Sequence, residues 1–386
     1  MNLSEILNQL GENRSEYLNS VAPPVFQASM FCFDSVDAMR KGLKNEMETP
    51  FYSRGYNPTV GILRKKLAAL EKAEDSLVFS SGSAAIAASA ISFLKNGDHV
   101  ICIKKPYSWT NKLFNDLLSR FGVKTTFVDG SDSNNFKNAI QKNTRLIYLE
   151  SPNSITFELQ DLESIAKIAK ENNIITICDN SYCTPLNQNP ISLGIDIVVH
   201  SASKYLSGHS DVVAGVVCSN KKFIHQIMSK EFMTIGSIIS PNDAWLILRG
   251  LRTLPLRVEK STQTALKVVD FLQNHPKIEK VLHPFITTNT QFSLAQKQMK
   301  PCGGLFSIQL KTNDIQKVDL FVNSLKHFLI ACSWGGYESL VFPMSALYNS
   351  QNYNNNELPF NLIRLYIGFE EENLLLEDLN QALNKI

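Results

Sequence analysis

Lys204 has the most unusual surroundings of any residue in this sequence. It follows Ser201-Ala202-Ser203, and the four residues before these (197–200, IVVH) have the apolar character of a buried strand. A lysine beside hydroxyl groups at a strand end suits an amine that forms a Schiff base next to a phosphate bound by the hydroxyls. An exposed loop lysine is the structural alternative, and Lys204 by itself does not exclude it.

Two further features also follow predicted strands. Asp179 comes directly after the apolar run 174–178 (IITIC), at the strand end where an α/β sheet binds its ligand. The structural alternative is that Asp179 caps a turn. Residues 80–86 (SSGSAAI) join a strand to a helix and would present backbone N–H groups and a helix dipole to an anion; tight packing is the alternative. An amine, a carboxylate and a phosphate site are the parts that pyridoxal phosphate requires, so together they predict this cofactor.

The elements that must position these residues alternate along the chain. Short apolar segments, several apolar on both faces as buried parallel strands are, alternate with helical patterns up to about residue 245. This alternation predicts a doubly wound α/β domain, in which the strand ends meet at one edge. The predicted strands are Ser76–Phe79, His99–Ile103, Lys124–Val128, Arg145–Glu150, Ile174–Asp179, Ile197–His200 and Ala214–Cys218.

The chain is expected to form three parts. These are an N-terminal arm (1–56), a cofactor-binding domain (57–248) and a smaller α/β C-terminal domain (249–386). The elements expected after the large sheet are a long helix or a helix pair at 241–272, strands near 304–310 and 362–367, and a closing helix at 371–386. Two polar stretches, 132–135 and 349–356, predict surface loops.

Composition excludes several classes of protein. The 386 residues carry 38 basic and 36 acidic side chains, a net charge of +2, which argues against a nucleic-acid-binding arm. No apolar run approaches the roughly 18 residues of a membrane helix, and the first residues do not resemble a secretory signal. The seven cysteines are scattered without a C-x-x-C, so we expect reduced thiols, no metal site and a cytoplasmic location.

The segment Asp179–Gly215 resembles the cofactor-lysine signature of the Cys/Met-metabolism (trans-sulfuration) family of pyridoxal-phosphate enzymes. It reads DNSYCTPLNQNPISLGIDIVVHSASKYLSGHSDVVAG, and the resemblance extends from about Pro23 to the C-terminus. The family includes cystathionine γ-synthase, cystathionine β-lyase, cystathionine γ-lyase and methionine γ-lyase. The resemblance implies an aspartate-aminotransferase-like fold, with a mainly parallel sheet in the large domain, and pyridoxal phosphate as cofactor.

The resemblance also implies roles for matching residues. Lys204 and Tyr107 would be catalytic, with Lys204 bonded to the cofactor and Tyr107 stacked on its ring. The other cofactor-binding residues would be Asp179 at the ring nitrogen, and Gly82, Ser83, Ser201 and Ser203 at the phosphate, with Tyr52 and Arg54 reaching the phosphate of a neighbouring subunit. The substrate-binding residues would be Arg364 at the carboxylate, assisted by Ser333, with Trp334, Asn153 and Tyr52. Sharing of sites implies a dimer at least, and a homotetramer of two such dimers is expected.

The motifs divide between members of the family. Residues 150–156 (ESPNSIT) and 333–337 (SWGGY) look like the β-lyase form. The asparagine usual at the fifth place of the first motif, which the resemblance implies at the cofactor's phenolic oxygen, is Ser154 here, so Asn153 would have to supply that contact. Residues 52–59 (YSRGYNPT) look like the γ enzymes. Cys332 stands where γ enzymes have glutamate and β-lyases tyrosine, and Trp109 is expected to reshape the substrate mouth.

The leading prediction is a carbon–sulfur lyase that cleaves cystathionine by β-elimination to homocysteine, pyruvate and ammonia. The alternatives are cystathionine γ-synthase, cystathionine γ-lyase or methionine γ-lyase, and alanine racemisation as a side activity with Tyr107 as the second acid. A catalytically silent binding protein is a further alternative, disfavoured because Lys204, Asp179, Tyr107 and Arg364 are all present.

Overall fold

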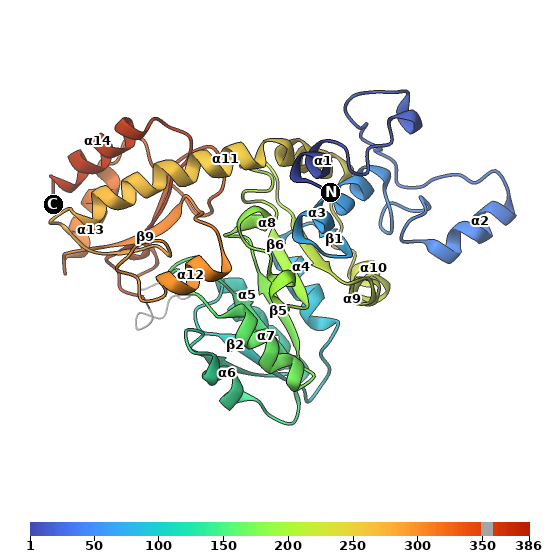
Figure 1. The fold of residues 1–386 in the computed structure, drawn as a ribbon, viewed down its shortest axis with the longest axis horizontal. Helices are drawn as coiled ribbons and strands as arrows, with labels where there is room; N and C mark the ends of the chain where they lie inside the picture. Colours follow the sequence, from blue (N-terminus) through green and yellow to red (C-terminus); the bar gives the residue numbers. More distant parts are fainter. Residues whose placement is uncertain (349–357) are drawn as a thin grey trace.

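The computed structural model describes residues 1–348 and 358–386 and has two β-sheets that lie along the two halves of a long helix (Figure 1). The large sheet has the order β1-β7-β6-β5-β4-β2-β3. Strand β7 runs antiparallel to both of its neighbours, and the other pairs are parallel. Its strands are β1 (Asp75–Phe79), β2 (His99–Ile103), β3 (Lys124–Val128), β4 (Thr144–Glu150), β5 (Ile175–Asp179), β6 (Ile197–Ser201) and β7 (Gly215–Ser219). Each of the seven strands predicted from sequence is present within one residue of its expected ends.

Both faces of the large sheet are buried, which explains why its strands are apolar throughout. Alternate residues of one strand enter different cores: Ile177 packs on one face and Cys178 on the other. Side chains from α3, α7 and the first half of α11 cover one face, and side chains from α4 and α9 cover the other. The helices up to α11 are α1 (Leu3–Asn8), α2 (Val36–Gly42), α3 (Pro58–Glu71), α4 (Gly82–Ile91), α5 (Ser108–Lys112), α6 (Ser133–Ala139), α7 (Leu162–Glu171), α8 (Thr184–Asn187), α9 (Lys221–Ile227), α10 (Met233–Ile235) and α11 (Pro241–Gln273).

The smaller sheet has the order β10-β11-β12-β9-β8 and packs against α13, α14 and the second half of α11. Sequence analysis found β9, β12 and the terminal helix; β8, β10 and β11 were not predicted. The elements of this part are β8 (Ile278–Leu282), α12 (Phe292–Gln298), β9 (Leu305–Leu310), α13 (Ile315–Ser324), β10 (Leu329–Ile330), β11 (Leu340–Pro343), β12 (Leu362–Tyr366) and α14 (Glu372–Leu383).

Helix α11 connects the two parts and supports the Lys204 loop. Its 33 residues span about 50 Å, and the expected domain boundary at 248/249 falls inside this continuous helix. Arg257 of α11 donates to the carbonyl of Tyr205 (2.8 Å), and a Cβ at Gly250 would collide with the carbonyl of Ser207. The loop that carries Lys204 is therefore fixed against the helix that joins the domains.

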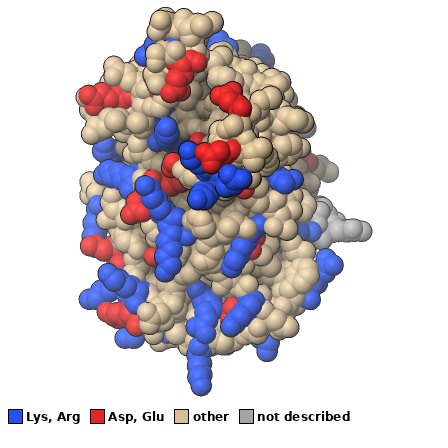
Figure 2. Space-filling model, turned by 90° about the vertical axis from the view of Figure 1, so that its right-hand side faces the viewer, with Lys and Arg blue, Asp and Glu red and all other residues tan. Residues whose placement is uncertain are grey.

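The two helices of the N-terminal arm are placed differently. Helix α1 is bound to the large domain, because Nζ of Lys66 on α3 donates to the carbonyls of Ile6 and Leu7. Helix α2 projects away from the rest of the molecule, at the right of Figure 1. The arm exposes apolar side chains, among them Met30 (67%) and Val36 (73%). Figure 2 shows the face of the molecule that forms the right-hand side of Figure 1. On this face, basic and acidic groups are interspersed between uncharged areas.

Two further findings concern the predicted loops and membrane spans. The prediction of a loop at 132–135 is wrong, because the Asp132 side chain accepts the N–H of Asn134 and caps α6. The second predicted loop, 349–356, lies outside the described residues. In the described part of the chain, no helix is long and apolar enough to cross a membrane.

Candidate active site

Lys204 lies at the centre of a cluster formed by both domains. It follows β6, and its Nζ donates to Oγ of Ser333 (2.5 Å) and lies 5.7 Å from the ring centroid of Trp334. Burial, and then the positive charge of Arg364, lower the pKa of Lys204 to about 8. An amine with this pKa is neutral in a substantial fraction of molecules near neutral pH, which suits a nucleophile and a base.

Two buried carboxylates end adjacent strands beside Lys204. Asp179 of β5 and Glu150 of β4 are paired in register, so they leave the sheet on the same side. Burial raises the pKa of Asp179, and the hydrogen bond from the N–H of Ser181 (2.9 Å) opposes that rise. Burial, and then the charge of Asp179, raise the pKa of Glu150 to about 7. The cluster thus holds two acids whose ionised forms need cationic or N–H partners.

Tyr107 stands at the start of α5 and faces the opening of the cluster. Its side chain is 41% exposed, and its backbone N–H donates to Oε2 of Glu150 (2.6 Å). Burial raises the pKa of its phenol. A hydrogen bond with the Ser83 side chain lowers this pKa, but by less than burial raises it. The phenol is therefore protonated at neutral pH and can act as a proton donor.

Arg364 comes from the smaller domain, on β12. It is 9% exposed, and it donates through Nη1 to the carbonyl of Ser154 (3.2 Å) and through Nη2 to that of Ser333 (3.5 Å). Its guanidinium also lies 5.3 Å from the ring centroid of Phe342. Burial lowers its pKa to about 10, so it stays cationic at neutral pH and can bind a carboxylate through two N–H groups.

The N-terminus of α4 lies next to β6 and presents groups that suit an anion. The Ser81 side chain caps the helix at the N–H of Ala84 (3.1 Å), and within the described residues the N–H groups of Gly82 and Ser83 have no acceptor. A Cβ at Gly82 would lie 3.1 Å from Cβ of Ser201, so helix and strand end are in close contact. Free N–H groups and a hydroxyl at a helix N-terminus suit a phosphate.

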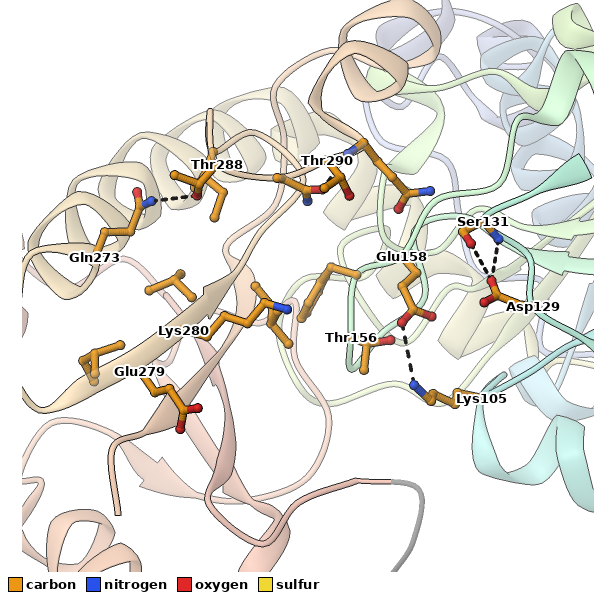
Figure 3. A pocket seen from close by; sticks show the side chains of 17 residues that line it. Lys105, Asp129, Ser131, Thr156, Glu158, Gln273, Glu279, Lys280, Thr288 and Thr290 are labelled. Atoms are coloured by element: carbon orange, nitrogen blue, oxygen red, sulfur yellow. Dashed lines mark hydrogen bonds and ion pairs between the residues drawn. The ribbon is translucent and has the colours of Figure 1, made fainter. Parts of the chain in front are cut away.

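A separate groove of about 770 Å³ lies between the domains and does not include this cluster (Figure 3). Three of its charged side chains have local partners: Lys105 lies 3.7 Å from Glu158, and Asp129 accepts from Ser131. The groove is lined by Lys105 and Thr156, each two residues away from Tyr107 and Ser154, but by neither of these two residues.

Comparisons with known proteins match this geometry. A family model described as Cys/Met metabolism PLP-dependent enzyme matches residues 5–384. The chain belongs to this family. It is 40% identical to an L-methionine gamma-lyase of Fusobacterium nucleatum (95% of this chain, 94% of that protein) and 36% identical to a cystathionine gamma-lyase of Bacillus subtilis (97% of each). The solved structure of metB from Corynebacterium glutamicum superimposes with a TM-score of 0.93 at 34% identity, over 100% of this chain and 98% of that one.

The cofactor of this trans-sulfuration family, pyridoxal phosphate, fits the cluster. Lys204 has a lowered pKa beside the buried carboxylate of Asp179, and the unpaired N–H groups of Gly82 and Ser83 lie beside Ser201. These groups supply an amine, a partner for the ring nitrogen and a phosphate site. The prediction of this cofactor and of the aspartate-aminotransferase-like fold is confirmed by the family match and the solved structure.

Three predicted site residues are engaged elsewhere. The Asn153 side chain accepts the N–H groups of Thr156 and Phe157 and donates to the Thr156 hydroxyl, so it holds its own loop instead of facing the cluster. The Ser203 hydroxyl accepts the N–H of Ala214 (2.9 Å) and bonds its carbonyl. Trp334 is 7% exposed and packs edge-on against Tyr205, so it supports Lys204 from behind.

Tyr52 and Arg54 lie on the arm, apart from the other predicted residues. Both are exposed, and the Arg54 guanidinium stacks 5.5 Å from the Tyr52 ring centroid. No hydrogen bond joins either side chain to Lys204 or Arg364 within the described residues. Their predicted role in a neighbouring subunit's site remains a prediction.

Sequence analysis gave no role to Glu150 and left Cys332 without an assigned contact. Glu150 could have been found by the reasoning that identified Asp179, because both end a buried strand. Cys332 is exposed at the cluster and lies close enough to affect the pKa values of Lys204, Arg364 and Tyr107. Cys183 is buried, with its thiol donating to Sδ of Met299, and Nδ1 of His209 bonds the Ser207 carbonyl, so both have local structural contacts.

Proposed function

We propose that this trans-sulfuration enzyme is a carbon–sulfur lyase for an amino acid with an uncharged thioether side chain. On methionine, with one water consumed, the products would be methanethiol, 2-oxobutyrate and ammonia. The observation that carries the proposal is Cys332, which places a thiol and not a carboxylate at a position of the cluster where a second amino-acid group such as that of cystathionine would need a charged partner. The 40% identity to an L-methionine gamma-lyase supports it.

The side chains of the cluster divide the work of γ-elimination. Arg364 binds the substrate carboxylate through two N–H groups. Asp179 pairs with the ring nitrogen of pyridoxal phosphate, which when bound supplies the electron sink that makes the Cα proton acidic. Lys204 would take the Cα proton and then a Cβ proton as base, which lets the Cγ–S bond break, and would return protons to carbon as acid when the product forms. The raised pKa of Tyr107 keeps its phenol protonated to donate to the departing sulfur.

The reaction predicted from sequence, β-elimination of cystathionine, stands as the second candidate. The 150–156 run (ESPNSIT) favours it. That prediction also rested on the absence of a glutamate at position 332 and on Trp334. The Trp334 ring packs against Tyr205, so it gives the prediction less support than its place in the motif suggested.

Product analysis separates the two candidates. The protein loaded with pyridoxal phosphate is incubated with methionine, cystathionine and cysteine in parallel, and the 2-oxo acids and thiols are identified. We expect 2-oxobutyrate and methanethiol from methionine. Pyruvate and homocysteine from cystathionine, with methionine unchanged, would overturn the proposal in favour of the second candidate. If none of the three amino acids gives a product, the result would favour the alternative of a catalytically silent binding protein.

A matched variant tests the role of position 332. Cys332→Glu introduces the carboxylate that γ enzymes of the family commonly place there, as the resemblance implies. We expect kcat/KM for cystathionine to rise relative to that for methionine, and Cys332→Ser should leave the ratio close to that of the parent. Equal ratios in all three proteins would show that Cys332 does not govern the choice.

We further propose that two copies share each site, in a tetramer of two such dimers, and that the enzyme works in the cytoplasm. The exposed apolar side chains of the arm and the exposed pair Tyr52 and Arg54 support association. The seven cysteines, all in the described part of the chain and all free, are consistent with a reducing compartment. Sedimentation equilibrium would measure the subunit number directly.

A further inference from the structure

Glu150 joins two loops that carry different parts of the candidate site. Its Oε2 accepts the backbone N–H of Tyr107 (2.6 Å), in the loop after β2, and its Oε1 accepts the backbone N–H of Ser154 (2.9 Å), in the loop after β4. The side chain is 5% exposed, and both oxygens are satisfied. A single carboxylate therefore sets the distance between the two loops.

The second loop passes this constraint to the smaller domain. The carbonyl of Ser154, next to the N–H that Glu150 binds, accepts from Nη1 of Arg364. Arg364 also donates to the carbonyl of Ser333, whose hydroxyl accepts from Lys204. The path from Tyr107 to Lys204 thus consists of hydrogen bonds between side chains and backbone, with Glu150 at its first branch.

Only an ionised carboxylate satisfies both N–H groups at once. Each amide N–H needs an acceptor, and a carboxylate offers one on each oxygen. Glutamine, or a protonated Glu150, would turn a donor toward one of the two N–H groups and leave it unpaired in a buried place. The residue type, and not only its size, is therefore fixed by the two loops.

We propose that Glu150 is a positioning residue for the substrate carboxylate: it fixes the Tyr107 loop against Ser154 and thereby holds Arg364 where it clamps the substrate. Glu150 does not touch the substrate in this arrangement. The inference rests on the proposed function for the identity of the substrate, but not for the presence of an amino-acid carboxylate, which every candidate substrate carries.

The charge of Glu150 is set by its surroundings. Six ionisable groups interact electrostatically with Glu150. They are Asp179 and Cys178 on β5, Arg364 on β12, Tyr107 before α5, Cys102 on β2 and Tyr148 on β4. Asp179 disfavours the carboxylate, while the two N–H groups and Arg364 favour it. Because its pKa is about 7, protonation near neutral pH would remove one of the two acceptors in the same way as glutamine.

The test compares Glu150→Gln with Glu158→Gln. Glu158 lies in the same loop but on its groove side, where it pairs with Lys105, two residues before Tyr107 (Figure 3). The probe is glycine, whose binding is followed by the absorbance change of the bound cofactor and needs no turnover. Cofactor affinity and thermal stability are measured on the same three proteins.

We expect Glu150→Gln to raise the dissociation constant of glycine about tenfold at pH 8 and Glu158→Gln to leave it within twofold, because only the first change removes a buried acceptor from the clamp. We expect the difference between parent and Glu150→Gln to shrink as the pH falls from 8 to 6, because the parent then loses the same acceptor. Cofactor affinity should change little in either variant.

Equal glycine affinities in Glu150→Gln and the parent at pH 8 would overturn the proposal. If Glu150→Gln does not fold, Glu150→Asp takes its place: it keeps two acceptors on a shorter side chain, so glycine should bind several-fold more weakly, and unchanged binding would refute the role. Failure of methionine turnover in the parent would count against the proposed function alone, since glycine binding still reports on the clamp.

Discussion

Replacing Gly335 by alanine should separate the Ser333 loop from Lys204. Gly335 has φ +90°, where a side chain costs about 1–3 kcal/mol. Its Cβ would lie 2.7 Å from the backbone nitrogen of Tyr205 and 2.8 Å from the carbonyl carbon of Lys204. Ordinary contacts between such atoms are about 3.5–4.0 Å, so one of the two segments must move by about 1 Å.

This displacement falls on the contacts that assemble the site. The 2.5 Å hydrogen bond from Lys204 to Ser333 crosses the boundary that would widen, and the hydrogen bond from Arg364 ends at the carbonyl of the same Ser333. A misplacement of about 1 Å can lower a rate about 100-fold. We therefore expect kcat/KM of Gly335→Ala to fall about 100-fold, measured by release of the 2-oxo acid under steady-state conditions.

Gly97→Ala is the matched control. Gly97 has φ +86°, close to that of Gly335, but no atom lies within 4 Å of the position of its Cβ. It should lose a similar amount of stability from backbone strain, measured as the shift in Tm, and keep its activity. If the two variants lose activity equally at equal Tm, contact between Gly335 and the Lys204 backbone does not organise the site, and the reasoning is refuted.

The remaining predictions concern Lys204, Arg364, the subunit contact and Tyr107. Because the pKa of Lys204 is lowered to about 8, its protonated form predominates below that pH, so the rate at which apoenzyme incorporates pyridoxal phosphate should rise with pH and level off above about 8; a flat profile from pH 6.5 to 9 would contradict this. Below pH 8 the buried charge also lowers stability, and stability should recover from pH 8 toward 10.5, so apo Lys204→Met should gain Tm over the parent at pH 7. Arg364→Lys should raise KM about 10- to 100-fold, more than it changes kcat, because one charged donor replaces a pair. Mixing inactive Arg54→Ala and Lys204→Ala subunits should restore up to about one quarter of the activity if sites are shared, and no recovery after unfolding and refolding together would exclude sharing. Incubation of L-alanine for hours should give D-alanine, which Tyr107→Phe abolishes; its absence in the parent would remove Tyr107 as a second acid.

The large sheet could be predicted because each of its strands can be identified from its own residues. Helices cover both faces, so each strand is an apolar run bounded by polar residues, and Ile197–Ser201 or His99–Ile103 can be identified without knowledge of their neighbours. Two of the missed strands of the smaller sheet lack this signal: β10 has two residues, both exposed, and β8 has a single buried residue. Strand β11 is a largely buried apolar run of four residues, too short to distinguish from a loop by its pattern alone.

The site residues that could be predicted are those whose function depends on their own side chain at a strand end. Lys204 and Asp179 belong to this class. Glu150 also ends a buried strand and could have been singled out in the same way, but its role could not, because its partners are backbone N–H groups, one of them 43 residues away, and no side-chain pattern records them. Asn153 fails for the opposite reason: several N–H groups within four residues compete for its side chain and hold it in its own loop.

The position of Trp334 changes where specificity should be sought. Its motif suggested that the indole lines the substrate site, but Gly335 brings the backbone of this loop against Lys204 and turns the ring onto Tyr205. Tyr107 and Cys332 are exposed among the described residues of the site. A thiol at position 332, where the resemblance implies a glutamate in the γ enzymes, gives a distal ammonium group no carboxylate partner at that position, which is the physical reason to expect methionine before cystathionine.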